Sequence, residues 1–278
     1  MKFVPRKADG RVNISEGPHL LWFVKLLLGL VVLVAVLYLA LGLIADQIAS
    51  RISVETELKI NALLGLPPPH EPLNDNERYL QGLVDRLAAQ VEPPSDYDFR
   101  VEISCTPRIN ALAVPGGKIV MFSGLLEELM TENEVAMILG HEIGHHLNHD
   151  QLRKMGRRLV PLAIGALLGF GGGADGVIEP AASLSALRYS RGQERAADLV
   201  GLELLQRAYG HANGAVTAQM RLSLANAPTW MDEIPDTFST HPKQEKRIDF
   251  LRRIIKERGY PLEAVQALPV EFKNTLCE

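Results

Sequence analysis

The sequence predicts an α+β fold that is mainly helical, with a small β-sheet and one transmembrane helix ahead of the folded domain. Three observations predict it. An uncharged apolar run extends from Leu26 to Ala45, two short segments in the middle of the chain alternate like strands, and most of the sequence after Gly124 has helical periodicity. The chain has 278 residues, 47% hydrophobic and 22% charged, a composition typical of a globular protein with a substantial core.

Charge balance and cysteine content exclude several classes of protein. A formal net charge of -4 gives the chain no general attraction for nucleic acid. Its two cysteines, Cys105 and Cys277, are too few for a zinc ribbon, an iron–sulfur site or a disulfide-rich scaffold. They can form one disulfide in an oxidising compartment, and the sequence alone leaves that pairing open.

The apolar run Leu26–Ala45 is long enough to cross a membrane. At about 1.5 Å per residue, a helix of this length spans the roughly 30 Å hydrocarbon core. A cleaved signal peptide is the alternative, because the amino terminus is basic and small residues follow the run. The run is longer than the apolar core of about 7–15 residues in a signal peptide, and no clean A-x-A site follows it. We therefore predict a transmembrane anchor over residues 20–45.

The charges on either side of the run predict its orientation. Only two basic residues follow it closely, Arg51 and Lys59, whereas four precede it: Lys2, Arg6, Lys7 and Arg11. The positive-inside rule then places the amino terminus in the cytoplasm and sends the remaining chain across the membrane. In a bacterium this is a single-pass protein of the inner membrane with its folded domain in the periplasm.

The proline-rich stretch LPPPHEP at residues 66–72 is the best domain boundary. Before it, Asp46–Leu64 is expected to continue the helix as it leaves the membrane. The predicted order is a cytoplasmic tail (1–19), the anchor (20–45), a linker (46–75) and one folded domain (76–278).

Periodicity gives the elements of the first half of the domain. An amphipathic helix is expected over 76–90, closed by two prolines, followed by strands over 99–104 and 118–122. The intervening INALAVPGG reads as a short strand that ends in a turn. A strong helix is expected over 132–148, with Thr131 as its N-cap and Glu134 as the capping-box partner.

Two later segments are also predicted to be helical, one within 188–208 and one over 243–258. The second has an apolar face formed by Ile248, Leu251, Ile254 and Ile255. The apolar run Leu159–Phe170 is only about half as long as a membrane span and leads into three glycines. It is either a buried core helix followed by a linker or a segment that touches the membrane or gates the substrate.

The stretch GHEIGHH at residues 140–146 supplies a candidate metal centre. On a helix, His141 and His145 are one turn apart on the same face, so both imidazoles can bind one ion. Glu142 lies about 100° further around the axis, where it can accept a proton from an attacking water without binding the metal. These are the parts of a metal-assisted peptide hydrolase, with one zinc ion as the cofactor.

Catalytic zinc normally has three protein ligands. An extended H-E-x-x-H-x-x-G-x-x-H motif would put the third histidine at position 151, which is Gln151. In the segment Glu194-Arg195-Ala196-Ala197-Asp198, a helix places Glu194 and Asp198 on one face. We therefore predict Glu194 as the third ligand, with Asp198 orienting a ligating histidine. His146 points to a different face and is not expected to bind metal.

Four segments together resemble the M48 metallopeptidases, the group of the CaaX-prenyl protease Ste24, the heat-shock protease HtpX and the mitochondrial protease Oma1. They are NALAVPGG (110–117), HEIGHH (141–146), SRGQERAAD (190–198) and STHP (239–242). They occur in the family's order and cover most of residues 76–258. The resemblance implies a zincin-type peptidase domain. With a single amino-terminal anchor, the chain is similar to the Oma1-like, single-domain periplasmic branch.

The resemblance also implies roles for residues outside the zinc ligands. A strand that includes Asn110, Ala111, Leu112 and Ala113 would form the exposed sheet edge that binds an extended substrate through backbone hydrogen bonds. His241 would lie near the zinc, with a catalytic role in which it donates to the oxyanion of the transition state. Alternatively, His241 occupies the open zinc position and keeps the enzyme latent, or it only begins a helix.

Together these features predict a membrane-anchored zinc metalloendopeptidase. It would hydrolyse peptide bonds of unfolded or damaged envelope or membrane proteins as a form of quality control. Its partners would be such polypeptides and the lipid bilayer, not nucleic acid. Two alternatives stay open: a latent zinc-binding protein that captures unfolded strands like a chaperone, and a processing protease with one specific substrate.

Overall fold

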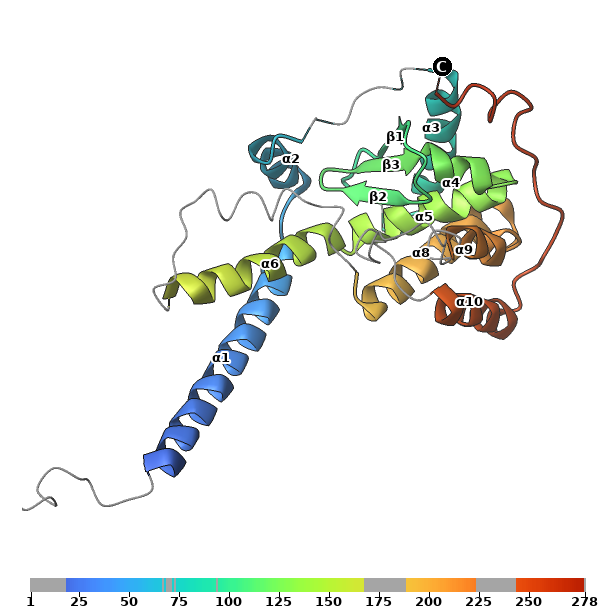
Figure 1. The fold of residues 1–278 in the computed structure, drawn as a ribbon. Helices are drawn as coiled ribbons and strands as arrows, with labels where there is room; N and C mark the ends of the chain where they lie inside the picture. Colours follow the sequence, from blue (N-terminus) through green and yellow to red (C-terminus); the bar gives the residue numbers. More distant parts are fainter. Residues whose placement is uncertain are drawn as a thin grey trace, which may run out of the picture.

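A three-stranded sheet and several helices form the folded domain, and one long helix projects away from it (Figure 1). This computed structural model describes residues 19–66, 68, 72, 74–93, 95–167, 189–223 and 244–277. Its helices are α1 (His19–Ala49), α2 (Val54–Leu63), α3 (Asp75–Ala88), α4 (Ser123–Glu128), α5 (Glu132–Leu147), α6 (Asp150–Leu167), α8 (Arg191–Tyr209), α9 (Ala215–Ser223) and α10 (Gln244–Arg258). The mainly helical α+β class with a small sheet is confirmed.

Helix α1 contains a stretch of 30 residues, Leu20–Ala49, that is long and apolar enough to cross a membrane. Its apolar side chains are mostly exposed, as expected of a helix that lies outside a protein core. The helix does not continue to Leu64 as the sequence suggested. It ends at Ala49, and Ser53 caps the separate helix α2 by accepting a hydrogen bond from the backbone N–H of Thr56.

The sheet has the strand order β1-β3-β2, with β1 (Arg100–Ser104) parallel and β2 (Ala111–Val114) antiparallel to β3 (Lys118–Phe122). Strand β2 is therefore an edge strand, and no other strand among the described residues pairs with its outer side. Two glycines with positive φ, Gly116 and Gly117, form the turn from β2 to β3.

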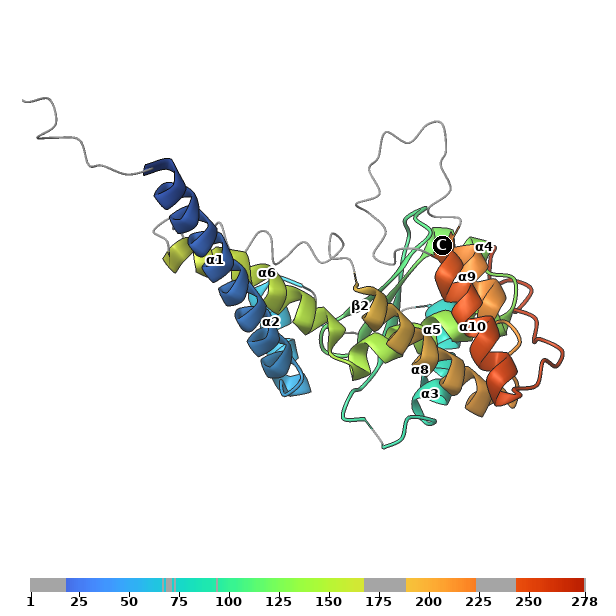
Figure 2. The same cartoon turned by 90° about the horizontal axis from the view of Figure 1, so that it is seen from below.

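Helix α5 is the centre of the domain. Thr131 and Glu134 form the predicted capping box at its start, and every residue from Glu132 to His146 is buried. The sheet covers one side of α5, while α8 and α9 cover the other (Figure 2). Because α5 carries the His-Glu-x-x-His motif, this packing places the motif at the heart of the fold rather than on a loop.

The segment after α10 closes the far side of the domain. It runs back along the core, where Phe272 and Leu276 are buried, and Cys277 forms a disulfide with Cys105 at a Cα–Cα distance of 5.7 Å. The structure therefore pairs the two cysteines whose pairing the sequence left open. A second connection is an isolated bridge between Thr131 and Ala267.

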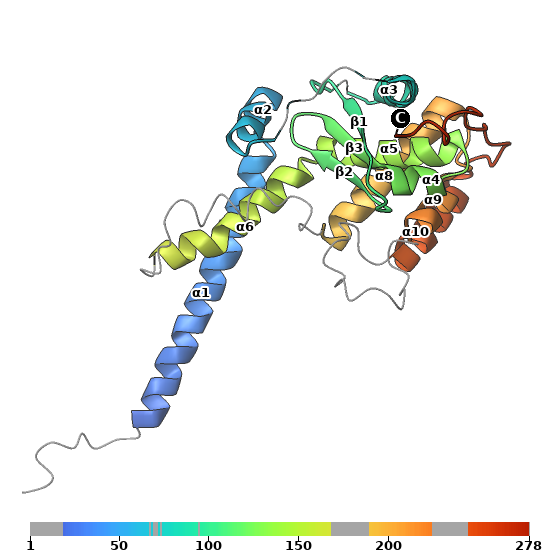
Figure 3. The same cartoon turned by 45° about the horizontal axis from the view of Figure 1, so that its top comes forward.

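Helices α2 and α6 join the domain to α1. The buried carboxylate of Glu57 on α2 accepts hydrogen bonds from the Gly116 N–H at 2.6 Å and from the Tyr97 hydroxyl, and it lies 3.1 Å from His149 Nδ1. Helix α6 starts directly after α5 and lies beside α1 rather than within the core (Figure 3). The predicted linker thus contains a helix that is fixed to the folded domain.

Candidate metal centre

Small residues bring α5 and α8 into backbone contact. A Cβ added at Gly144 would lie 2.9 Å from the Ala197 Cα, and one added at Gly201 would lie 2.8 Å from the His141 backbone nitrogen. Both distances are too short for a side chain. The glycines on α5 and α8 therefore let the helices approach closely enough for Glu194, near the start of α8, to reach the histidines of α5.

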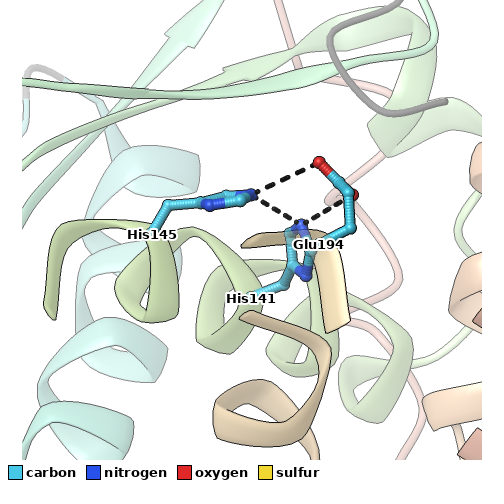
Figure 4. Close-up of side chains that lie close together, drawn as sticks. All are labelled: His141, His145 and Glu194. Carbon is cyan, nitrogen blue, oxygen red and sulfur yellow. Dashed lines mark hydrogen bonds and ion pairs between the residues drawn. The ribbon is translucent and has the colours of Figure 1, made fainter. Parts of the chain in front are cut away.

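The side chains of His141, His145 and Glu194 converge (Figure 4). The Nε2 atoms of the two histidines lie 3.1 Å apart, and each lies 3.8 Å from one oxygen of the Glu194 carboxylate. All three side chains are buried, and their ligand atoms lie within 4.8 Å of one another. Two histidines and one carboxylate form a donor set that is common in catalytic zinc sites.

The distances fit zinc. Two nitrogens bound to a tetrahedral zinc at about 2.0–2.1 Å lie about 3.3–3.4 Å apart. The observed separations of 3.1 Å and 3.8 Å lie on either side of this value, so small rotations of the side chains complete the site. The chain therefore contains a buried His-His-Glu metal site of the type typical of zinc.

Each ligating histidine is held through its other ring nitrogen. His145 Nδ1 lies 2.9 Å from Asp150 Oδ2, and His141 Nδ1 lies 3.1 Å from Asp198 Oδ1. A carboxylate that accepts from Nδ1–H fixes the ring orientation and leaves Nε2 to face the metal. Sequence reasoning placed Asp198 in this role but missed Asp150, the first residue of α6.

Residues 74–255 match the family description Peptidase family M48. The chain belongs to peptidase family M48. With this match, its buried His-His-Glu centre is the metal site of an M48 peptidase domain. The family predicted from four short motifs is confirmed.

The proteins that this chain resembles in sequence fall into two groups. The chain is 33% identical over 145 residues to the mitochondrial metalloendopeptidase OMA1 of Arabidopsis thaliana, covering 52% of this chain and 29% of that protein. It is 28% identical over 203 residues to the beta-barrel assembly-enhancing protease of Yersinia pestis, covering 68% and 41%. The OMA1 metalloendopeptidase of Schizosaccharomyces pombe is 30% identical over 174 residues, covering 61% and 50%. The chain thus spans half or less of each of these proteins.

A buried cation, Arg247 on α10, also belongs to this M48 site. Its Nη1 lies 2.6 Å from Glu194 Oε2, and its Nη2 lies 2.6 Å from Asp198 Oδ1. Only 3% of Arg247 is exposed, so its charge acts in a region from which water is excluded. Sequence reasoning missed Arg247, although it occurs four residues before Leu251 on the apolar face of its helix.

Burial and neighbouring charges shift the pKa values around the site. Burial alone would raise the pKa of Asp198, but the charge and hydrogen bonds of Arg247 lower it well below the usual range. Burial raises the pKa of Asp150 to about 6, although a hydrogen bond from Gln193 opposes the shift. At neutral pH both carboxylates are ionised and accept from the histidines.

Two further groups lie close to the ligands. The ring of Tyr189 stacks on His145 with centroids 3.7 Å apart, and burial raises its pKa well above 10. Glu142 is 1% exposed, and its charge raises the pKa values of both Tyr189 and Arg247. The expected general base therefore lies among the charged groups of the metal site.

The other residues singled out from the sequence lie as follows. Ala111, Leu112 and Ala113 belong to β2, the edge strand that packs on α5, and Asn110 immediately precedes it. His146 is buried and points away from the ligands, donating from Nε2 to the Lys118 carbonyl at 3.1 Å. His241 lies outside the described residues, so its catalytic role stays a prediction.

We expect Asp150→Asn to lower the affinity for zinc by about 10–100-fold, because an amide holds the His145 ring less firmly in the ligating orientation. Competition with a chromophoric chelator measures this affinity. Asp249→Asn on α10 is the matched control, since the Asp249 side chain is 78% exposed. Equal affinity in both variants would show that Asp150 does not support the metal site.

Proposed function

We propose that this chain is a zinc-dependent endopeptidase, anchored in a bacterial inner membrane, that hydrolyses unfolded or damaged envelope proteins. The observation that carries the proposal is the convergence of His141, His145 and Glu194 next to Glu142. Glu194 and the two histidines would hold the ion. When bound, zinc supplies a Lewis acid that polarises water and the scissile carbonyl.

The residues of the chain have separate tasks in this reaction. Glu142 accepts a proton from the attacking water on its carboxylate and returns it to the nitrogen of the leaving amine. Asp150 and Asp198 keep the two histidines oriented through Nδ1. Arg247 balances the negative charge of Glu194 and Asp198 inside the protein.

Three observations support a periplasmic location. The basic residues before α1 outnumber those that follow it closely. The disulfide between Cys105 and Cys277 is typical of a protein in an oxidising compartment. Bacterial relatives include the beta-barrel assembly-enhancing protease of Yersinia pestis.

Cleavage of an unfolded protein tests the activity directly. We expect the full chain, purified in mild detergent and loaded with zinc, to cut reduced casein at many sites. A chelator should stop the cleavage and added zinc restore it. Zinc binding without cleavage would instead favour a latent, chaperone-like protein. Cleavage at one site in one folded protein would favour a processing protease.

The edge strand β2 supports recognition of an extended, unfolded substrate. The Phe122 N–H donates to the Asn110 carbonyl at 3.2 Å, so residues 110 and 122 form a hydrogen-bonded pair. Because such pairs alternate along an antiparallel ladder, the N–H and C=O groups of Ala111 and Ala113 point away from β3. Ala111 and Ala113 are 1% and 6% exposed in this structure, so a substrate strand forms a ladder with these groups only after the part of the chain that covers them moves aside.

We therefore expect Ala113→Pro to weaken substrate binding while the sheet stays intact. Proline removes an outward N–H and leaves the hydrogen bonds to β3 in place. Losing one such bond, worth about 1 kcal/mol, should raise KM for casein roughly fivefold with little change in kcat. Leu112→Pro is the contrasting variant, since it removes an inward N–H and should destabilise the sheet. An unchanged KM for Ala113→Pro would contradict binding at this edge.

A further inference from the structure

An apolar groove lies between the end of α1, helix α2 and helix α6, away from the metal ligands. Its volume is about 490 Å³, within the range of roughly 300–1,000 Å³ of pockets that bind small molecules. Its wall consists of apolar side chains, among them Leu41, Ala45 and Ile48 from α1, Ile60 from α2, Leu64 directly after α2, and Met155 from α6. A site of this composition selects an apolar ligand.

The position of α1 indicates which apolar ligand reaches the groove. The candidate span of 30 residues is about 45 Å long, against a hydrocarbon core of roughly 30 Å. With Lys25 at one membrane surface, about 20 residues of helix bring Ala45 to the other. The α1 wall of the groove therefore begins at Leu41, about one helical turn inside the hydrocarbon, and continues past its edge.

The rim of the groove has the properties of a membrane interface. Large apolar side chains from all three helices line the groove and are exposed, including Ile44 at 54%, Leu63 at 81% and Leu159 at 41%. Asp46 pairs with Arg157 at the level where α1 leaves the hydrocarbon. An exposed apolar surface that continues the surface of a membrane helix is covered by lipid rather than by water.

Close packing fixes α6 against α1 beside the groove. A Cβ added at Gly156 would lie 3.1 Å from the Ala45 Cβ, so a glycine on α6 allows the two helices to approach. Leu152 lines the groove two residues after Asp150, which holds His145. One helical turn of α6 therefore connects the groove with the metal site.

We propose that this groove binds one acyl chain of a phospholipid from the membrane that holds α1. The chain lies along α1 and contacts α2 and α6, which keeps the start of α6 at the membrane surface. The proposal rests on the anchoring part of the proposed function and is independent of peptide hydrolysis. It assigns a lipid-binding site to a groove that lies outside the metal centre.

Photolabelling tests the site. The full-length Glu142→Gln chain is placed in phosphatidylethanolamine–phosphatidylglycerol vesicles that contain a phospholipid with a diazirine near the end of one acyl chain. After irradiation, mass spectrometry locates the label. We expect label at Ile60 on α2, at Leu64 directly after it and at Met155 on α6, in addition to the lipid-facing residues of α1.

A groove-filling variant provides the control. Ile60→Trp should remove the label from Leu64 and Met155, whereas Leu33→Trp, on the exposed side of α1, should leave it in place. Leu64→Trp is a second filling variant, and Met155 should lose its label there too. Equal melting temperatures show that the variants fold.

Three results would overturn the proposal. Label on α1 with none on α2 or α6 would show that the groove excludes lipid while the anchor is correctly placed. If a photoreactive amino acid placed at Leu64 crosslinks two copies of the chain, a second copy fills the groove. If α1, α2 and α6 all lack label, the result would contradict the anchoring of α1 in the membrane.

Discussion

Glu142→Gln is expected to lower kcat for peptide hydrolysis by about 10²–10⁴-fold without loss of zinc. Glutamine has nearly the same shape as glutamate but cannot accept a proton from the attacking water. The ligands are His141, His145 and Glu194, so the substitution leaves the metal site intact. Casein cleavage and zinc content, measured on the same preparations, separate the two effects.

The control for this variant removes a glutamate elsewhere in the same domain. Glu127→Gln on α4 alters an exposed side chain and should retain full activity. If Glu142→Gln cuts casein as fast as the wild type, another group takes the proton and the assigned role of Glu142 is wrong. If its zinc is lost as well, the loss of activity says nothing about proton transfer.

Local patterns in the sequence predicted the central part of the fold. The capping residues and the apolar spacing predicted one helix over 132–148. Helix α5 extends over Glu132–Leu147 and has the expected capping box. The strands over 99–104 and 118–122 were likewise predicted from alternation and correspond to β1 and β3. Each of these elements depends mainly on residues close to one another in the chain.

Features that depend on how elements meet could not be predicted in the same way. Asp150 reaches His145 only because the chain turns between α5 and α6, where His149 has a φ of 50°. The docking of α2 depends on Glu57, whose partners Tyr97 and Gly116 are far away in the sequence. No periodicity within a helix specifies such contacts.

Arg247 is an intermediate case. Helical spacing puts it on the same face as Leu251 and Ile255, which are both buried. An arginine on an apolar face requires a buried anionic partner, and this requirement was a usable signal. Only the folded structure identifies the partners as Glu194 and Asp198, which belong to a different helix.

Arg247→Met is expected to destabilise the metal-free protein by about 3–5 kcal/mol, because it leaves two buried carboxylates without their cation. Denaturant unfolding of the full chain in detergent, followed by near-ultraviolet circular dichroism, measures the loss. Arg252→Met on the same helix is the control, since the Arg252 side chain is 55% exposed and should contribute little. An equal effect of both substitutions would show that the Arg247 ion pairs do not stabilise the fold.

The pH dependence distinguishes lost charge pairing from lost packing. In the wild type the pKa of Asp198 is lowered by Arg247, so this carboxylate contributes stability above its unfolded pKa of about 4 and loses it as the pH falls. Without Arg247, His141 still lowers the pKa of Asp198 but burial opposes it, so the folded variant is expected to protonate Asp198 at a higher pH than the folded wild type does. The deficit of Arg247→Met should therefore be largest at neutral pH and shrink towards pH 4. A deficit caused by lost packing alone would stay constant over this range, because no proton is bound or released.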